Sequence, residues 1–241
     1  MKSNKSLVGF DRYVEREWLD EVAHIVVDGN SLIDVNEKLD AYLAPIIGGE
    51  TSRRKTKNIL TATWAKSQPR DVYFKRQAVD MFAYANSGDR LAIHYGICVA
   101  TYPFFMALSK ILGRLFKLQD EVNNTEFYRR VIEVVGDRES IKRAAARYLQ
   151  SLIEWGVLAA GSSCSVKKAY ILPVGDPVLV TWLYSAPLYS SDRERLSVDD
   201  IVSDPCWFPF EISHDLFRYQ KSENLEVVHH SVGSTLVALR S

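Results

Sequence analysis

The feature that most constrains this chain is a run of 19 residues, Leu91–Ser109, without a formally charged side chain. A run of that length approaches the roughly 20 residues that cross a bilayer, so it either spans a membrane or lies at the centre of a core. Pro103 interrupts it, as do polar residues such as His94 and Thr101, and a lipid-exposed helix would leave these polar groups without water. The residue before a proline is also pushed out of the helical region. We therefore expect two buried helices broken at Tyr102 and no contact with a membrane.

The composition of the whole chain is that of a folded globular protein. Its 241 residues are 47% hydrophobic and 25% charged, which supplies enough apolar surface for a substantial core. Thirty Lys and Arg residues balance thirty Asp and Glu residues, which argues against packaging of nucleic acid by net charge. Three widely spaced cysteines argue against a disulfide framework and a CxxC site. Since MKSNKSLVGF contains no long apolar run, we expect a cytoplasmic protein.

Residues 1–118 are predicted to form a helical domain. Apolar residues recur there at helical spacing, and turns rich in Gly, Pro, Asn and Asp separate the helices. Ser31 is expected to cap the second helix. Thr51 or Ser52 is expected to cap the third, because a hydroxyl at this position accepts a hydrogen bond from a free backbone N–H group.

The middle of the chain changes character in a definite order. A short amphipathic helix follows Asn123, a turn at Gly136 leads to a helix over residues 138–155, and two β-prone pieces follow at 157–160 and 166–172. Helix, turn, helix and hairpin are the order of a winged helix-turn-helix. The predicted fold class is mainly α, with a helical domain (1–118), a winged helix-turn-helix domain (119–190) and an acidic α+β segment (191–241).

The end of the chain gives weaker signals. Residues 177–184 are predicted to form a short helix, and residues 186–196 a polar loop. The β-rich runs 225–230 and 234–239 are separated by Ser231-Val232-Gly233, which predicts a terminal hairpin.

Charge is unevenly distributed along the chain. Residues 1–50 carry five basic and ten acidic side chains, residues 51–76 carry eight and one, and residues 191–241 carry five and nine. A neutral protein with one basic region can bind an anion through that region and have acidic neighbours or partners elsewhere.

The densest basic element is the tetrad Arg53, Arg54, Lys55 and Lys57. If Thr51 or Ser52 caps this helix, three cations occupy its first turn, where the helix dipole disfavours them. Phosphate groups would compensate, since cations and free N–H groups both attract them. The alternative is that the tetrad pairs with acidic residues of the first two helices.

The second basic element is the helix over residues 138–155. Its buried stripe is predicted to be Ile141, Ala145, Tyr148, Leu149, Leu152 and Ile153. The cations pointing away from the stripe are Arg138, Lys142, Arg143 and Arg147. Such a face on the second helix of a helix-turn-helix suits phosphate contacts and major-groove reading. In the hairpin, Lys167 and Lys168 are expected to contact a neighbouring phosphate or the minor groove. The alternative is a winged helix that serves only for protein interaction.

The sequence contains no motif that predicts catalysis. GxSxG, GxxxxGK[ST], GxGxxG and HExxH are all absent. His229 and His230 would face opposite sides of a strand, which prevents joint coordination of one metal ion. His94 is predicted to be a hydrogen-bonded core residue. We therefore expect no enzyme activity, metal, cofactor or small-molecule substrate.

The layout resembles one known family. The stretches SRRKTKNIL, SGDRLAIHYGICVATYPFF and IKRAAARYLQSLIEWGVL, the last followed by a hairpin, are similar in organisation to BrxA-type small proteins of bacteriophage exclusion (BREX) systems. The resemblance covers about residues 10–185, and the acidic region beyond residue 190 is an extension that the family does not need. The resemblance implies a helical, non-enzymatic, DNA-binding accessory subunit of a defence system, acting beside a DNA methyltransferase, a phosphatase-like protein and an ATPase.

These observations predict that the protein binds double-stranded DNA as part of a multiprotein complex. If about six to eight of the cations contact phosphates, the logarithm of affinity falls against log salt with a slope of about −5 to −7. The alternative function is a protein-interaction scaffold, in which the winged helix and the basic tetrad dock a partner protein.

Overall fold

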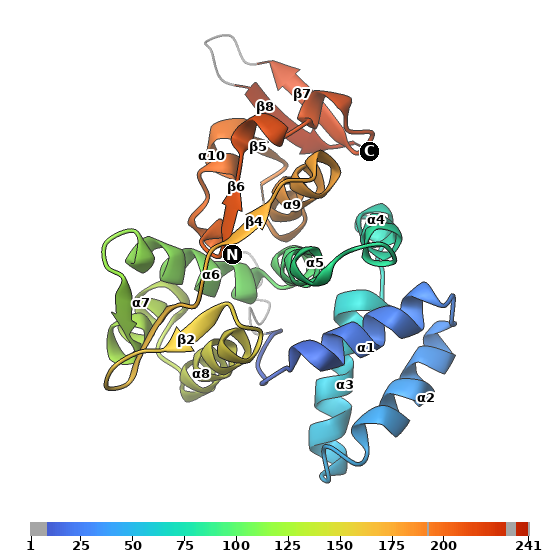
Figure 1. The fold of residues 1–241 in the computed structure, drawn as a ribbon, viewed down its shortest axis with the longest axis vertical. Coiled ribbons are helices and arrows are strands. Elements are labelled where there is room, and N and C mark those ends of the chain that lie inside the picture. The colour runs from blue at the N-terminus through green and yellow to red at the C-terminus, as the bar shows by residue number, and fades with distance from the viewer. Residues whose placement is uncertain (1–8, 192, 230–234, 241) are drawn as a thin grey trace, which may run out of the picture.

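The structure is a computed structural model that describes residues 9–191, 193–229 and 235–240. This part of the chain is mainly helical, with small sheets (Figure 1). The helices are α1 (Arg16–Val27), α2 (Leu32–Leu43), α3 (Glu50–Trp64), α4 (Val72–Phe82), α5 (Ser87–Thr101), α6 (Pro103–Phe116), α7 (Asn124–Val135), α8 (Glu139–Glu154), α9 (Pro177–Ser190) and α10 (Val198–Val202). The strands are β1 (Glu121–Asn123), β2 (Leu158–Ala160), β3 (Ser165–Lys168), β4 (Leu172–Val174), β5 (Arg195–Ser197), β6 (Phe210–Ile212), β7 (Leu225–His229) and β8 (Thr235–Leu239). Short 3-10 turns are η1 (Pro205–Trp207), η2 (His214–Leu216) and η3 (Tyr219–Lys221).

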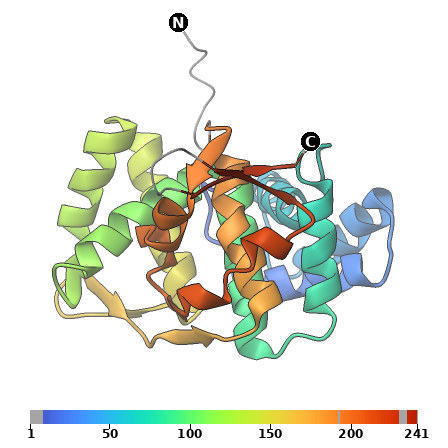
Figure 2. The same ribbon diagram turned by 90° about the horizontal axis from the view of Figure 1, so that it is seen from above.

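Helix α5 lies between two groups of helices. Figures 1 and 2 show α1–α3 on one side of it and α6–α8 on the other. The C-terminal strands β5, β7 and β8 lie apart from both groups, beyond α9 (Figure 1). Buried side chains from all three predicted domains, such as Phe10, Tyr148 and Trp207, belong to one continuous hydrophobic cluster. The division at residues 118 and 190 stays a prediction.

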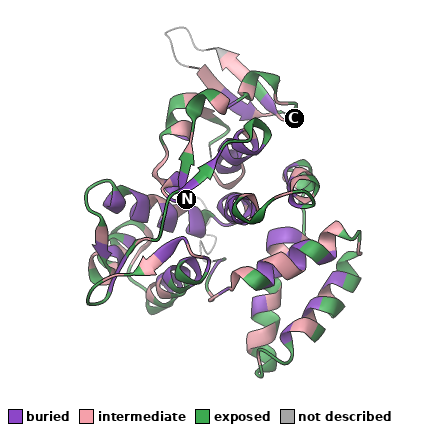
Figure 3. Ribbon diagram, in the orientation of Figure 1, coloured by how far each residue is buried: buried purple, intermediate pink, exposed green. Residues whose placement is uncertain are grey.

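The uncharged run forms the centre of this core, as expected from its sequence. Helices α5 and α6 break at Tyr102, and every residue from Leu91 to Ala100 is buried (Figure 3). Gly96 allows α9 to approach α5, because a Cβ atom there would lie 2.5 Å from the Trp182 ring. Among the described residues no single helix is long and apolar enough to cross a membrane, although α5 and α6 pass that test together as a pair bent by 115°.

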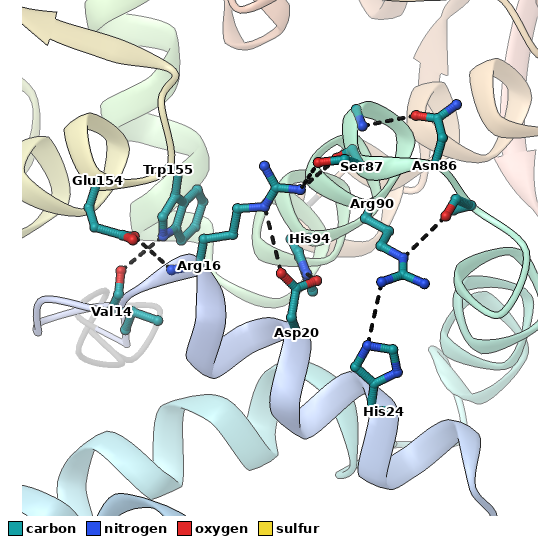
Figure 4. A network of polar contacts seen from close by, with 12 residues as sticks. Val14, Arg16, Asp20, His24, Asn86, Ser87, Arg90, His94, Glu154 and Trp155 are labelled. Atoms are coloured by element: carbon teal, nitrogen blue, oxygen red, sulfur yellow. Dashed lines mark hydrogen bonds and ion pairs between the residues drawn. The ribbon is translucent and has the colours of Figure 1, made fainter. Parts of the chain in front are cut away.

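The start of α1 is fastened to the end of α8. The Val14 backbone N–H donates to Ser151 Oγ at 2.8 Å, and Trp155 Nε1 donates to the Val14 carbonyl oxygen at 2.9 Å. The Arg16 backbone N–H donates to Glu154 Oε2 at 2.6 Å; Figure 4 shows the contacts made by Trp155 and Glu154. The extended segment before α1 is therefore held against α8, far from it in sequence.

Two helix starts test the capping predictions. The Ser31 cap of α2 is confirmed, and Asp34 completes a capping box with it. The expected Thr51 or Ser52 cap of α3 is wrong: α3 begins at Glu50, after Gly49, and its cap makes no side-chain hydrogen bond. The Ser52 hydroxyl instead accepts a hydrogen bond from Arg12 Nη1 at 2.9 Å.

Helix α9 is longer than its sequence predicted. The expected helix stopped at residue 184 and a polar loop began at residue 186, but α9 continues to Ser190 with Pro187 inside it. Residues 182–188 are all buried, and α9 packs against α5. Tertiary packing overrides the expected break because these residues fill the core.

The central region contains the predicted two helices and a sheet. Strands β1, β3 and β2 form an antiparallel sheet in that order, and α6 packs against α7 and α8. The expected second strand over residues 166–172 is wrong in extent. It ends at Lys168, and Leu172 starts β4, which pairs in parallel with β6.

The C-terminal segment closes with the predicted hairpin. Strands β7 and β8 pair antiparallel, with Leu225 opposite Leu239, and β5 pairs with the other edge of β8. The turn predicted at residues 231–233 and His230 lie outside the described residues.

Candidate nucleic-acid interface

Helix α3 carries the predicted tetrad, and the structure divides it. Lys57 Nζ lies 2.9 Å from Asp40 Oδ1, and Arg53 Nε lies 3.5 Å from the same oxygen. The hydrogen bond from Lys57 holds the pKa of Asp40 below its usual value, with the two nearby cations adding to the effect. Arg54 and Lys55 are exposed and have no carboxylate partner within the described residues. The pairing alternative therefore accounts for half of the tetrad.

The position of these cations in α3 also changes the argument from the helix dipole. Because α3 begins at Glu50, Arg53 and Arg54 lie two or three residues further from the helix start than expected. An acidic residue occupies the first turn, which the dipole favours. The conflict that pointed to phosphate is absent, so phosphate binding by α3 needs evidence from other residues.

Helix α8 has the predicted amphipathic character. Its inner face buries Ile141, Ala144, Ala145, Tyr148, Leu149, Ser151 and Leu152. Ile153, expected in the buried stripe, is instead 37% exposed. Arg138, Arg143 and Arg147 are exposed, as expected. Lys142 pairs with Asp137 at 3.0 Å, and Arg147 Nη1 donates to Gln150 Oε1 at 2.8 Å.

The two basic elements meet at a cleft between α3 and α8. The α3–α8 cleft has a volume of about 490 Å³. It is lined by Asp11, Arg12, Tyr13, Trp18, Ile47, Ser52, Lys55, Thr56, Ser140, Arg143 and Arg147. The spacing of Ser140, Arg143 and Arg147 by three and four residues places them on one flank of α8. Of the ten predicted contact residues, the cleft brings together Lys55, Arg143 and Arg147.

The hairpin lysines lie apart from this cleft. Side chains alternate across a strand, so Lys167 and Lys168 point to opposite faces of the sheet. Lys167 is exposed opposite Glu121 of β1. Lys168 lines a separate hollow that also contains Phe116 and Phe208. Neither lysine lines the α3–α8 cleft.

The tip of the β2–β3 hairpin is anchored by a carboxylate. Glu121 accepts hydrogen bonds from the backbone N–H and the hydroxyl of Ser162, both at 2.6 Å, and from the hydroxyl of Ser165. These hydrogen bonds, Ser162 first, hold the pKa of Glu121 below its usual value. The tip has the Ser-rich composition of a flexible loop, but β1 holds it in one position.

Arg12 is the cation of the cleft that the sequence patterns did not identify. It lies in the extended segment before α1, where hydrophobic periodicity gives no prediction. Its Nη1 donates to Ser52, while its Nε is buried and has no hydrogen-bond partner in the described part of the chain. The signal that the sequence offers is the Asp11-Arg12 dipeptide between the apolar residues Phe10 and Val14, which the structure buries.

The predicted core histidine is confirmed. His94 is fully buried; Trp64 Nε1 donates to its Nδ1 at 3.1 Å, and its Nε2 lies 3.1 Å from Asp20 Oδ1 (Figure 4). We infer that the proton is on Nε2. Burial lowers the pKa of His94, and the hydrogen bond to Asp20 only partly opposes this. For Asp20, burial raises the pKa, but the hydrogen bond from His94 and the positive charges of Arg16 and Arg90 together outweigh it, so that the pKa is lowered. With both nitrogens engaged, His94 has no free nitrogen for a substrate.

Comparisons of the chain with protein-family models, with curated proteins and with solved structures gave no match. In the portion of the chain that the structure describes, no group of three or more His, Cys, Asp or Glu side chains is placed to hold a metal ion.

Proposed function

We propose that this protein binds double-stranded DNA through the α3–α8 cleft and the exposed face of α8, without catalysing a reaction. The resemblance to BrxA-type proteins supports a role as an accessory subunit of a multiprotein phage-defence complex. In this proposal the DNA is the ligand, and the catalytic steps of defence belong to other subunits.

The observation that carries the proposal is the state of Arg143 and Arg147. Both are exposed, and within the described residues neither is paired with a carboxylate. They share a cleft with Lys55, which comes from a different helix and is also unpaired in that part of the chain. Exposed cations that are not neutralised internally are available to displace counterions from a duplex.

The order of elements supports the same proposal. We interpret α7 and α8 as a helix-turn-helix, α6 as the helix that supports it, and β2 and β3 as its wing. The succession α6, β1, α7, α8, β2, β3, with β3 between β1 and β2, fits a winged helix. In such a fold α8 is the helix that faces DNA.

A shift assay tests the proposal. Duplex DNA, single-stranded DNA and RNA of one length are titrated with the protein at several salt concentrations. We expect the duplex to bind most tightly, with an affinity that falls steeply as salt rises, because phosphate contacts release counterions. No shift of the duplex at the lowest salt, or an affinity independent of salt, contradicts the proposal. If the protein then forms a stable complex with a large partner protein, the scaffold function replaces DNA binding.

A further inference from the structure

Four cations from three separate segments line the α3–α8 cleft. They are Arg12 from the extended segment, Lys55 from α3, and Arg143 and Arg147 from α8. Asp11 is the one carboxylate among the lining residues, and none of the four cations is ion-paired with it or with another described carboxylate. Like charges that line one cleft repel one another, and an anion in the cleft would offset that repulsion.

Arg12 is held in position by its neighbours on both sides. Phe10 and Val14 are fully buried, and Val14 is hydrogen-bonded to Ser151 and Trp155 of the α8 region. On the other side, Arg12 Nη1 donates to Ser52 of α3. The guanidinium is thus fixed between the two helices that form the cleft, and ordering it on binding costs little conformational entropy.

The Nε–H of Arg12 identifies the kind of group that the cleft lacks. This atom is buried and has no acceptor in the described part of the chain. A buried charged donor without an acceptor is costly, and an anion that draws the guanidinium toward the cleft would supply the missing acceptor oxygen. The adjacent hydroxyls of Ser52 and Ser140 offer further hydrogen bonds to the same group.

We propose that the α3–α8 cleft is a phosphate-binding site in which Arg12 is the central binding residue. The group that the cleft holds is a phosphodiester of a nucleic-acid backbone. A guanidinium presents parallel N–H groups that match two phosphate oxygens, while Lys55 acts as a point charge. A cleft of about 490 Å³ is large enough to hold a phosphate group together with atoms of its neighbouring sugars. The proposal deepens the proposed function, because it assigns Arg143 and Arg147 to backbone contact instead of base reading.

Two variants on different elements test the site. Arg12→Lys keeps the positive charge but removes Nε and the planar fork. We expect duplex affinity about tenfold weaker, corresponding to one lost charge-assisted hydrogen bond, with the salt slope unchanged. Lys55→Gln removes an exposed charge and is expected to reduce the slope by about 0.9. Arg54→Gln is the matched control, since Arg54 is the exposed neighbour that does not line the cleft.

A second measurement uses inorganic phosphate as the probe. The melting temperature is recorded while phosphate replaces chloride at constant ionic strength. Phosphate is expected to stabilise the wild type and Arg54→Gln, but not Arg12→Lys, because binding to the folded state alone raises stability. Circular dichroism of each variant shows whether it is folded; if Arg12→Lys is not, the exposed Lys55→Gln change decides the test.

The outcomes separate this inference from the proposed function. If phosphate stabilises all variants equally, or Arg54→Gln lowers the salt slope as much as Lys55→Gln, the cleft is not the phosphate site although the duplex still binds. If phosphate stabilises the protein through Arg12 but no nucleic acid binds, the site holds a free phosphate ester. The phosphodiester assignment and the proposed function are then both wrong.

Discussion

Replacing Arg143 and Arg147 together with Ala is the most direct test of DNA binding. Both side chains are exposed, and within the described residues the only hydrogen bond that either side chain makes is from Arg147 to Gln150. Alanine is also the residue with the highest helix propensity. The double variant is therefore expected to fold as the wild type does, so that a change in DNA affinity reports on contact.

The size of the effect follows from the number of cations in the cleft. Each phosphate contact contributes about 0.9 to the slope of log affinity against log salt, so the four cleft cations predict a slope of about −3.6. Removing two of them leaves about −1.8. Between 50 and 200 mM salt, the wild type then loses about 150-fold in affinity and the double variant only about 12-fold.

Fluorescence anisotropy of a labelled duplex over this salt range measures both slopes. The control is Arg129→Ala with Arg130→Ala, which also removes two exposed positive charges. On α7 these arginines pair with Glu126 and Glu133 at 2.6 to 3.3 Å, and they do not line the cleft. We expect the control to keep the wild-type slope. Equal slopes in the two double variants would mean that net charge, not the cleft, determines binding.

Two further predictions concern the core. Gly96→Ala is expected to lower the free energy of unfolding by about 1–3 kcal/mol in urea denaturation, because its Cβ would meet the Trp182 ring at 2.5 Å. Gly48→Ala, whose Cβ would meet no atom of the described residues within 4 Å, should change that free energy by less than about 0.5 kcal/mol. His94 has a pKa below its unfolded value, so the unfolded chain takes up a proton first and stability falls as pH drops below about 6.5. Urea denaturation at pH 7.5 and 5.5 should show a smaller loss for His94→Gln than for the wild type; an equal loss assigns the pH dependence to other groups.

The parts of the fold that the sequence predicted depend on local patterns. The lack of charge in Leu91–Ser109, with Pro103 inside it, predicted two buried helices and the break between them. The periodicity of residues 138–155 predicted the buried face of α8, and Ser31 predicted the start of α2. In each case the signal lies within one helix, where spacing alone determines which side chains share a face.

The errors in the fold arise from contacts between distant segments. Helix α9 continues to Ser190 because residues 182–188 pack into the core, although Pro187 would favour an earlier end. Strand β4 leaves the expected hairpin because Leu172 pairs with Phe210 of β6. Neither partner can be identified from the local sequence of the segment concerned.

The same distinction applies to the cations. Periodicity placed Arg143 and Arg147 on the exposed face of α8, but the pairing of Lys57 with Asp40 joins two helices, and Arg12 lies in a segment without periodicity. These differences change the expected slope of log affinity against log salt. Counting about six to eight phosphate contacts from the sequence predicts a slope of −5 to −7, whereas four cleft cations predict about −3.6. A wild-type slope near −3.6 would show that DNA contact is confined to the four cleft cations; a slope beyond −5 would show that duplex binding recruits cations outside the cleft.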